Sequence, residues 1–287
     1  MHTSFITHAG GRYLWIALAF VTMSVIIYGW HDPEETPNGG TWYGYTMGTI
    51  GAVLIFWLLY LGRRKRNFAN GWGTVRGWVS AHVYLGGALL VVATLHTGFQ
   101  FALNIHTFAY VLMCLVIFSG FFGVWAYLTY PNARNLLKKS ETLDDIFLRL
   151  EDLDAQLKKS VAKMSDDVRS VVTSGVERTE IGGGLGDQIL GRDKSKVLIG
   201  GAVISNQNQT AAVEWLVHRR SNAVGEESQA LAIVVREYSS RQKLLSTIRE
   251  DVRMSAIQEI WLFFHVPMSF GLIAALVAHI VSVFLYW

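Results

Sequence analysis

The sequence predicts an all-α integral membrane protein, a bundle of five transmembrane helices with a polar helical segment inserted before the last of them. Residues of hydrophobic type make up 51% of the 287-residue chain. They gather in blocks that can cross the hydrocarbon core of a bilayer, which takes about 20 residues of helix. We therefore expect residues 1–130 to hold the first four spans, residues 131–259 to form the insertion, and residues 260–287 to supply the fifth span.

The apolar blocks begin and end at residues that suit a membrane interface or stop a helix. Trp30 and Trp42 lie at predicted helix ends, as in the aromatic belts of membrane proteins. Pro131 is expected to stop the fourth helix. No small-residue cleavage site follows the first block, so we interpret that block as a span and not as a signal peptide. The predicted spans are residues 13–30, 44–62, 77–103, 107–130 and 260–287.

The basic residues predict how the chain crosses the membrane. Residues 63–66, RRKR, follow the second span, whereas the loop after the first span carries acidic residues and no Lys or Arg. The positive-inside rule then places the 63–66 loop in the cytoplasm. We expect a multi-pass protein of the bacterial inner (cytoplasmic) membrane, with the N-terminus and the 131–259 insertion cytoplasmic and the C-terminus external. The net charge of +3 is too small to suggest a nucleic-acid partner.

The insertion is predicted to contain two helical runs joined by a glycine-rich connector. Apolar residues over 143–157 recur at alternating steps of three and four, like coiled-coil a and d positions, and continue over 161–171 after a stutter. The second run, 227–258, is expected to continue into the fifth span and to pair with the first as a hairpin. The connector lacks Gly-Lys-Ser/Thr, which favours a turn-rich link with a short hairpin at 196–205 over a phosphate site. The coiled coil could mediate homo- or hetero-oligomer formation.

Two of the spans carry histidine pairs with the same spacing. HVYLGGALLVVATLH runs from His82 to His96, and HVPMSFGLIAALVAH runs from His265 to His279. Fourteen residues advance a helix by about 1400°, within about 40° of four turns, so both members of a pair face one side roughly 21 Å apart. The two helices run in the same direction in the predicted topology. The four imidazoles therefore form two pairs at two depths.

Facing imidazoles at one depth suit a haem whose iron takes one axial nitrogen from each side. Helix bundles build cofactor sites from side chains on facing helices in this way. We expect two haem b groups, the inner one held by His82 and His265 and the outer one by His96 and His279. The other ring nitrogen of a metal-bound histidine usually donates a hydrogen bond, and the backbone carbonyls one turn before each ligand are the candidate acceptors. Small residues expected to make room for the porphyrins include Gly86, Gly87, Gly271, Ser119, Gly120 and Gly123.

Other roles for these histidines stay open. An intramembrane histidine can hydrogen-bond a neighbouring helix or relay protons, so a membrane sensor or a proton or ion transporter is the alternative. A zinc site is disfavoured because the two depths are too far apart and no Cys or acidic residue joins them. His106 is expected to be an interfacial histidine, in preference to a partner of an outer haem propionate. For residues 63–66, setting topology is preferred over balancing the inner haem propionates. His2, His8 and His31 are expected to be solvated.

Two stretches carry a resemblance to a known superfamily. RGWVSAHVYLGGALLVVATLHTGF resembles the two-histidine helix of membrane dihaem b-type cytochromes, the cytochrome b561-like and ferric-reductase-type transmembrane domains, and FFHVPMSFGLIAALVAHIVSVFLY resembles the partner helix. The resemblance covers the third to fifth spans. It implies haem ligation by His82, His96, His265 and His279 and transmembrane electron transfer, between the quinone pool and a c-type cytochrome or iron–sulfur protein of a respiratory chain.

The chain also departs from that superfamily. No flavin or nicotinamide domain follows the fifth span, the Pro-Glu-Trp-Tyr motif of quinol–cytochrome c reductases is absent, and the insertion at 131–259 is not a feature of these families. We therefore expect an electron-transfer subunit without a substrate-reaction domain of its own. A haem-containing membrane anchor subunit of a larger redox complex is the other interpretation.

Overall fold

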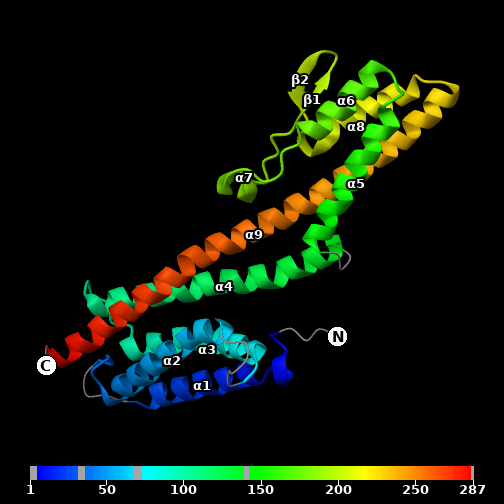
Figure 1. Ribbon diagram of the computed structural model, residues 1–287. Helices are drawn as coiled ribbons and strands as arrows, with labels where there is room; N and C mark the ends of the chain where they lie inside the picture. The colour runs from blue at the N-terminus through cyan, green and yellow to red at the C-terminus, as the bar shows by residue number, and fades with distance from the viewer. Residues whose placement is uncertain (1–4, 32–35, 67–72, 139–141, 286–287) are drawn as a thin grey trace. The chain divides into compact units, whose positions relative to one another are not determined.

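The computed structural model describes residues 5–31, 36–66, 73–138 and 142–285, with side chains described outside 130–138. The chain divides into two compact units. The first comprises residues 1–126 and 261–287, and the second comprises residues 127–260. Helix α9 (Gly225–Leu285) contributes its first part to the second unit and its last part to the first unit (Figure 1).

The first unit is a bundle of apolar helices. It contains η1 (His8–Gly11), α1 (Arg12–Trp30), α2 (Trp42–Arg66), α3 (Val75–Thr97), most of α4 (Ile105–Lys138) and the end of α9. Five helices of the described chain are long and apolar enough to cross a membrane, so this is a multi-pass membrane protein with five candidate spans. Many large apolar side chains of this unit, such as Trp15, Phe118 and Phe284, point outward, as lipid contact requires.

Two buried clusters hold the bundle together. One joins α1, α2 and α3 through Phe20, Met47 and Val92. The other joins α2, α3, α4 and α9, with Leu89 and Leu272 at its centre. The second cluster brings together the helices that carry the paired histidines, although these helices are far apart in the sequence.

The ends of two helices differ from the prediction. Helix α3 ends at Thr97 and not at residue 103, because Gly98 adopts a left-handed conformation (φ 56°) that ends the helix. His96 therefore lies in the last turn of α3. Helix α4 continues past Pro131 to Lys138. Proline's fixed φ is compatible with a helix, and its cost of about 3 kcal/mol in a helix interior does not keep α4 from continuing past Pro131.

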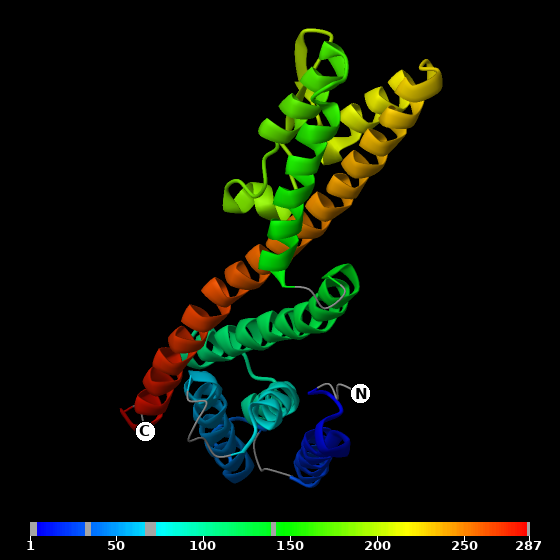
Figure 2. The same ribbon diagram turned by 45° about the vertical axis from the view of Figure 1, so that its right-hand side comes forward.

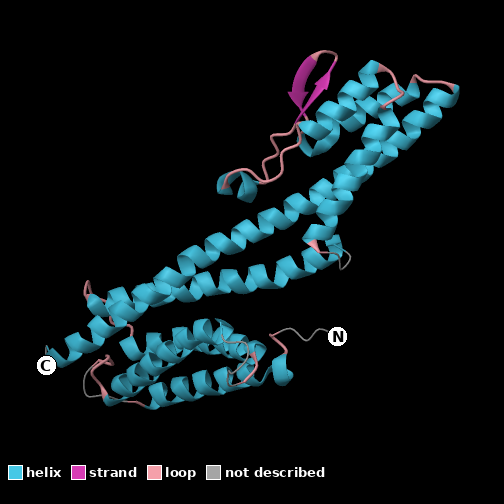
Figure 3. Ribbon diagram, viewed as in Figure 1, coloured by secondary structure: helices cyan, strands magenta, loops and turns pink. Residues whose placement is uncertain are grey.

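The second unit folds around the first part of α9. It contains α5 (Leu143–Val161), α6 (Asp166–Glu177), α7 (Leu185–Leu190), η2 (Gln207–Gln209) and α8 (Thr210–Ser221). Strands β1 (Lys196–Ile199) and β2 (Ala202–Ser205) pair antiparallel, which confirms the short hairpin expected there (Figure 3).

Helices α5 and α9 lie side by side and antiparallel in both views (Figure 2). Ile146 and Leu150 pack against Leu245 and Ile248, while Leu157, further along α5, joins a cluster at the start of α9. The expected continuation of the α5 pattern over 161–171 as the same helix is wrong. The chain turns after Val161 and restarts as α6, and its apolar spacing persists because both helices pack on one core.

A polar network lies inside the second unit. Arg241, 1% exposed, donates to Asp154 Oδ1 (2.6 Å) and to Gln209 Oε1 (2.9 Å). Gln209 Oε1 also accepts from Tyr238 (2.9 Å) and from Asn206 (3.2 Å). Burial raises the pKa of the Tyr238 hydroxyl to about 12, so this group is a neutral donor at ordinary pH.

Candidate functional site

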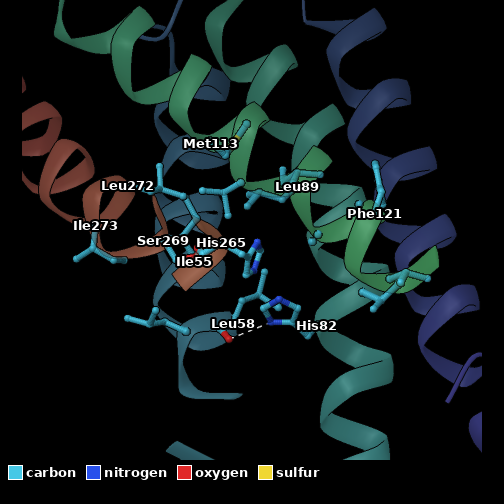
Figure 4. A pocket seen from close by; sticks show the side chains of 18 residues that line it. Ile55, Leu58, His82, Leu89, Met113, Phe121, His265, Ser269, Leu272 and Ile273 are labelled. Carbon is cyan, nitrogen blue, oxygen red and sulfur yellow. Dashed lines mark hydrogen bonds between the residues drawn. The ribbon is translucent and has the colours of Figure 1, made fainter. Parts of the chain in front are cut away.

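His82 and His265 line one cavity of the first unit. The cavity encloses about 700 Å³ of empty space, part of which is open to the surroundings. Helices α2, α3, α4 and α9 all contribute to its wall, which is almost wholly apolar. Figure 4 shows the two imidazoles next to each other in this cavity. The structure therefore brings together the two residues predicted to form the inner pair.

The glycines predicted to line the porphyrin faces occupy different places. Gly86 and Gly87 of α3 line the cavity, and so does Gly120 of α4. Gly271 does not belong to the cavity wall. A Cβ at this position would lie 3.7 Å from Leu112 Cδ2, so Gly271 permits close packing of α9 on α4.

The carbonyl of Leu58 in α2 fixes the imidazole of His82. His82 Nδ1 lies 3.1 Å from this oxygen. A carbonyl can only accept, so Nδ1 carries the proton, and the Nε2 lone pair of a neutral His82 is left free to bind a metal.

Ser119 of α4 fixes the imidazole of His265. The Ser119 hydroxyl lies 2.7 Å from His265 Nδ1 and donates its own proton to the Val116 carbonyl at 2.8 Å. The hydroxyl has a single proton, so His265 Nδ1 must be the donor of the other bond. Trp261 stacks on His265 with ring centroids 5.2 Å apart, and its Nε1–H donates to the Ser119 carbonyl at 2.7 Å. His265 therefore also leaves Nε2 free.

His96 and His279 face each other at the second level. Their ring centroids are 6.1 Å apart, and the planes make an angle of 84°. Two metal–nitrogen bonds of about 2.0–2.1 Å, with the distance from each nitrogen to its ring centre added, give a centroid separation of roughly 6 Å for two imidazoles on one metal. The observed separation is compatible with a shared metal between the two rings.

The imidazole of His96 packs tightly against α2. Its Nδ1 donates to the Gly44 carbonyl at 2.7 Å. A Cβ at Gly48 would lie 2.6 Å from His96 Cε1, closer than real Cβ atoms approach their neighbours. Only glycine at position 48 lets α2 come near enough to make this hydrogen bond.

His279 is paired with a fifth histidine. Its Nδ1 lies 2.5 Å from Nδ1 of His106, at the start of α4. A single proton must lie between these two nitrogens, since two lone pairs or two N–H groups would repel each other. His106 is exposed at the start of α4, in keeping with an interfacial histidine, and its contact with an expected ligand is an addition that the sequence did not predict.

An apolar layer separates the two levels. Leu89 lies midway between His82 and His96, and Leu272 lies midway between His265 and His279. A seven-residue step is within about 20° of two full turns, so each leucine lies on the face of its helix that carries the histidines. Both leucines are buried in one cluster with Met113 of α4.

The partners that hold the Nδ1 atoms of the four paired histidines differ from those that the sequence predicts. Carbonyls one turn before each ligand were expected, but the partners are carbonyls of α2 and side chains of α4. The spacing of Gly44, Gly48 and Gly51 was an available signal, because small residues at such steps permit close helix contact. His8 and His31, expected to be solvated, are half-buried, and His2 lies outside the residues that the structure describes.

The paired histidines are not part of a larger cluster of metal-binding side chains among the described residues. Within the described residues, no group of three or more His, Cys, Asp or Glu side chains could hold a metal ion. Each level instead offers two imidazoles on different helices, and at the inner level they lie in a largely apolar cavity. Comparisons with protein-family models, with curated proteins and with solved structures each find no match for this chain.

Proposed function

We propose that the chain is a membrane dihaem b-type cytochrome that carries electrons across the bilayer. His82 and His265 would hold the inner haem, and His96 and His279 the outer haem. The hydrogen bonds on Nδ1 carry the proposal: each ligand has this nitrogen engaged, and in His82, His96 and His265 the partner requires Nδ1 to donate. Metal-bound histidines have this arrangement, in which an outer partner fixes the tautomer and leaves Nε2 to the metal.

Bound haem would supply one-electron chemistry at each level. The residues of the chain orient the ligands, exclude water and set the local polarity. Two histidines per iron leave no open axial position, which favours electron transfer over reaction with oxygen. Helix α2, whose Leu58 carbonyl holds His82, ends with the basic residues 63–66, so cations at this end of the bundle would balance haem propionates.

The same proposal includes the orientation of the chain in the membrane and its redox partners. The loop with residues 63–66 and the polar insertion would face the cytoplasm of a bacterial inner membrane, and the outer haem would lie near the external side. Electrons would pass between the quinone pool and a c-type cytochrome or an iron–sulfur protein. The second unit, with its paired helices α5 and α9, would be the contact for a partner or a second copy.

The test is a reduced-minus-oxidised absorption spectrum with haem content per chain. We expect two haems b in the wild type and one in each of His82→Ala, His265→Ala, His96→Ala and His279→Ala, with the first two variants losing the same haem. The matched control is His218→Ala, because His218 is exposed on α8 of the second unit.

A wild type without haem bands would refute the proposal and leave a membrane sensor or a proton or ion transporter as the explanation of the histidines. If the haems are present but electrons pass only within a larger complex, isolation of the neighbouring subunits would identify a membrane anchor subunit.

A further inference from the structure

The ligands of α3 and α9 are held by different kinds of partner. His82 and His96 of α3 donate to backbone carbonyls of α2. His265 and His279 of α9 are held by side chains of α4, Ser119 and His106. A carbonyl is present whatever the residue, whereas a side chain can be substituted. The strength of the hydrogen bonds to the α9 ligands therefore depends on which residues stand at positions 119 and 106.

The position of one proton decides what His279 can do. If His106 donated its Nδ1–H, a neutral His279 would carry its own proton on Nε2 and could not bind a metal through that nitrogen. If His279 donates, its Nε2 is free and His106 accepts with the Nδ1 lone pair. Haem binding through Nε2 of His279 requires the second arrangement.

The acceptor for His279 at the outer level, His106, is stronger than the acceptor for His265 at the inner level, Ser119. The imidazole nitrogen of His106 is a more basic acceptor than the hydroxyl oxygen that Ser119 offers to His265. A stronger acceptor draws the Nδ1 proton away and makes the ligand a better electron donor to iron. Greater donation stabilises the oxidised iron and lowers its midpoint potential.

We propose that His106 is the positioning residue of the outer haem, which accepts the Nδ1–H of His279, fixes Nε2 as the ligating atom and lowers the midpoint potential at this level. This inference rests on the proposed haem ligation. His106 has no contact with the metal in this account and acts only through His279.

The experiment is a potentiometric titration of the purified full-length chain, followed by its visible haem bands. His106→Ala removes the acceptor, and His106→Asn retains a side-chain oxygen close to where Nδ1 lies. Ser119→Ala is the matched variant at the inner level. The haem lost in His96→Ala identifies the outer one.

We expect His106→Ala to raise the midpoint potential of the outer haem by about 59 mV, a tenfold change in its reduction equilibrium. Loss of the partner should also weaken retention of that haem by about 10–100-fold. His106→Asn should restore most of the retention but only part of the potential, because its amide oxygen accepts the bond yet is less basic than imidazole, and Ser119→Ala should affect the inner haem alone.

Two haems with unchanged potentials and retention in His106→Ala would overturn the inference and leave the proposed function intact. Equal shifts in His106→Ala and His106→Asn would overturn it as well, because the effect would then follow from packing and not from the acceptor. A wild type without haem would overturn both proposals.

Discussion

Replacing Gly48 with alanine should push the imidazole of His96, a proposed haem ligand, away from α2 by about 1 Å. The new Cβ would lie 2.6 Å from Cε1 and 2.9 Å from Nδ1 of His96. Carbon atoms need about 3.5–4.0 Å, so the ring must move about 1 Å away from α2. Gly44, whose carbonyl accepts from His96 Nδ1 at 2.7 Å, lies on the same helix. The shift would stretch this bond to roughly 3.6 Å or more, which is no longer a hydrogen bond.

The expected cost follows from the loss of that partner. Removing an outer-shell partner weakens metal binding by about 10–100-fold. At 1.4 kcal/mol for each factor of ten, the outer haem should lose about 1.4–2.8 kcal/mol of binding free energy. The inner haem should be unaffected, because His82 is held by a different carbonyl of α2, that of Leu58.

The assay is the transfer of haem from the purified protein to an excess of a haem-accepting protein, with the two haems followed by their separate bands. The matched control is Gly62→Ala, on the same helix, where an added Cβ meets nothing within 4 Å. Wild-type retention of the outer haem in Gly48→Ala would refute the reasoning. Equal losses in Gly48→Ala and Gly62→Ala would do so too.

Three further predictions concern the inner level and the second unit. Gly123→Ala should lower inner haem content and spare the outer haem in the difference spectrum, because Trp261, the ring stacked on the inner ligand, fills the space that a Cβ would need. Tyr238 has its pKa raised from 10.0 to about 12, so its hydroxyl stabilises the fold below about pH 10, and this contribution is lost as pH rises through 12. Thermal unfolding of Tyr238→Phe should lack this component between pH 10 and 12. Arg241→Ala should destabilise the second unit by about 1–3 kcal/mol, because buried Gln209 and partly exposed Asp154 both lose a charged donor. Hydrogen exchange along α9 measures this loss, and Arg236→Ala, at an exposed position, should change it little.

Helix periodicity explains why the paired histidines could be predicted. Residues 14 apart share a face on any regular helix, so the sequence alone was enough to place His82 with His96 and His265 with His279. Two further features were predictable because they depend on local signals in the sequence. Turn residues indicate the short hairpin at 196–205, and the lack of a helix breaker indicates the continuous helix through 258 into the fifth span.

The partners of the histidines could not be predicted in this way. The bond between His96 and Gly44 joins residues 52 apart in the sequence, and the bond between His265 and Ser119 joins residues 146 apart. Such contacts depend on how α2 and α4 pack, which no local pattern encodes. The end of α3 was misplaced because the apolar residues after Gly98 resemble a continuing span, while the left-handed backbone of Gly98 ends the helix.

The leucine layer between the two histidine levels has an electrostatic consequence. With the levels roughly 21 Å apart along the helices, one added electron would repel a second by about 0.8 kcal/mol at an effective dielectric constant of 20. This corresponds to about 34 mV for a one-electron couple. If each level held a haem as proposed, reducing one would make reduction of the other only slightly harder, with the buried side chains of Leu89 and Leu272 keeping the space between the levels apolar.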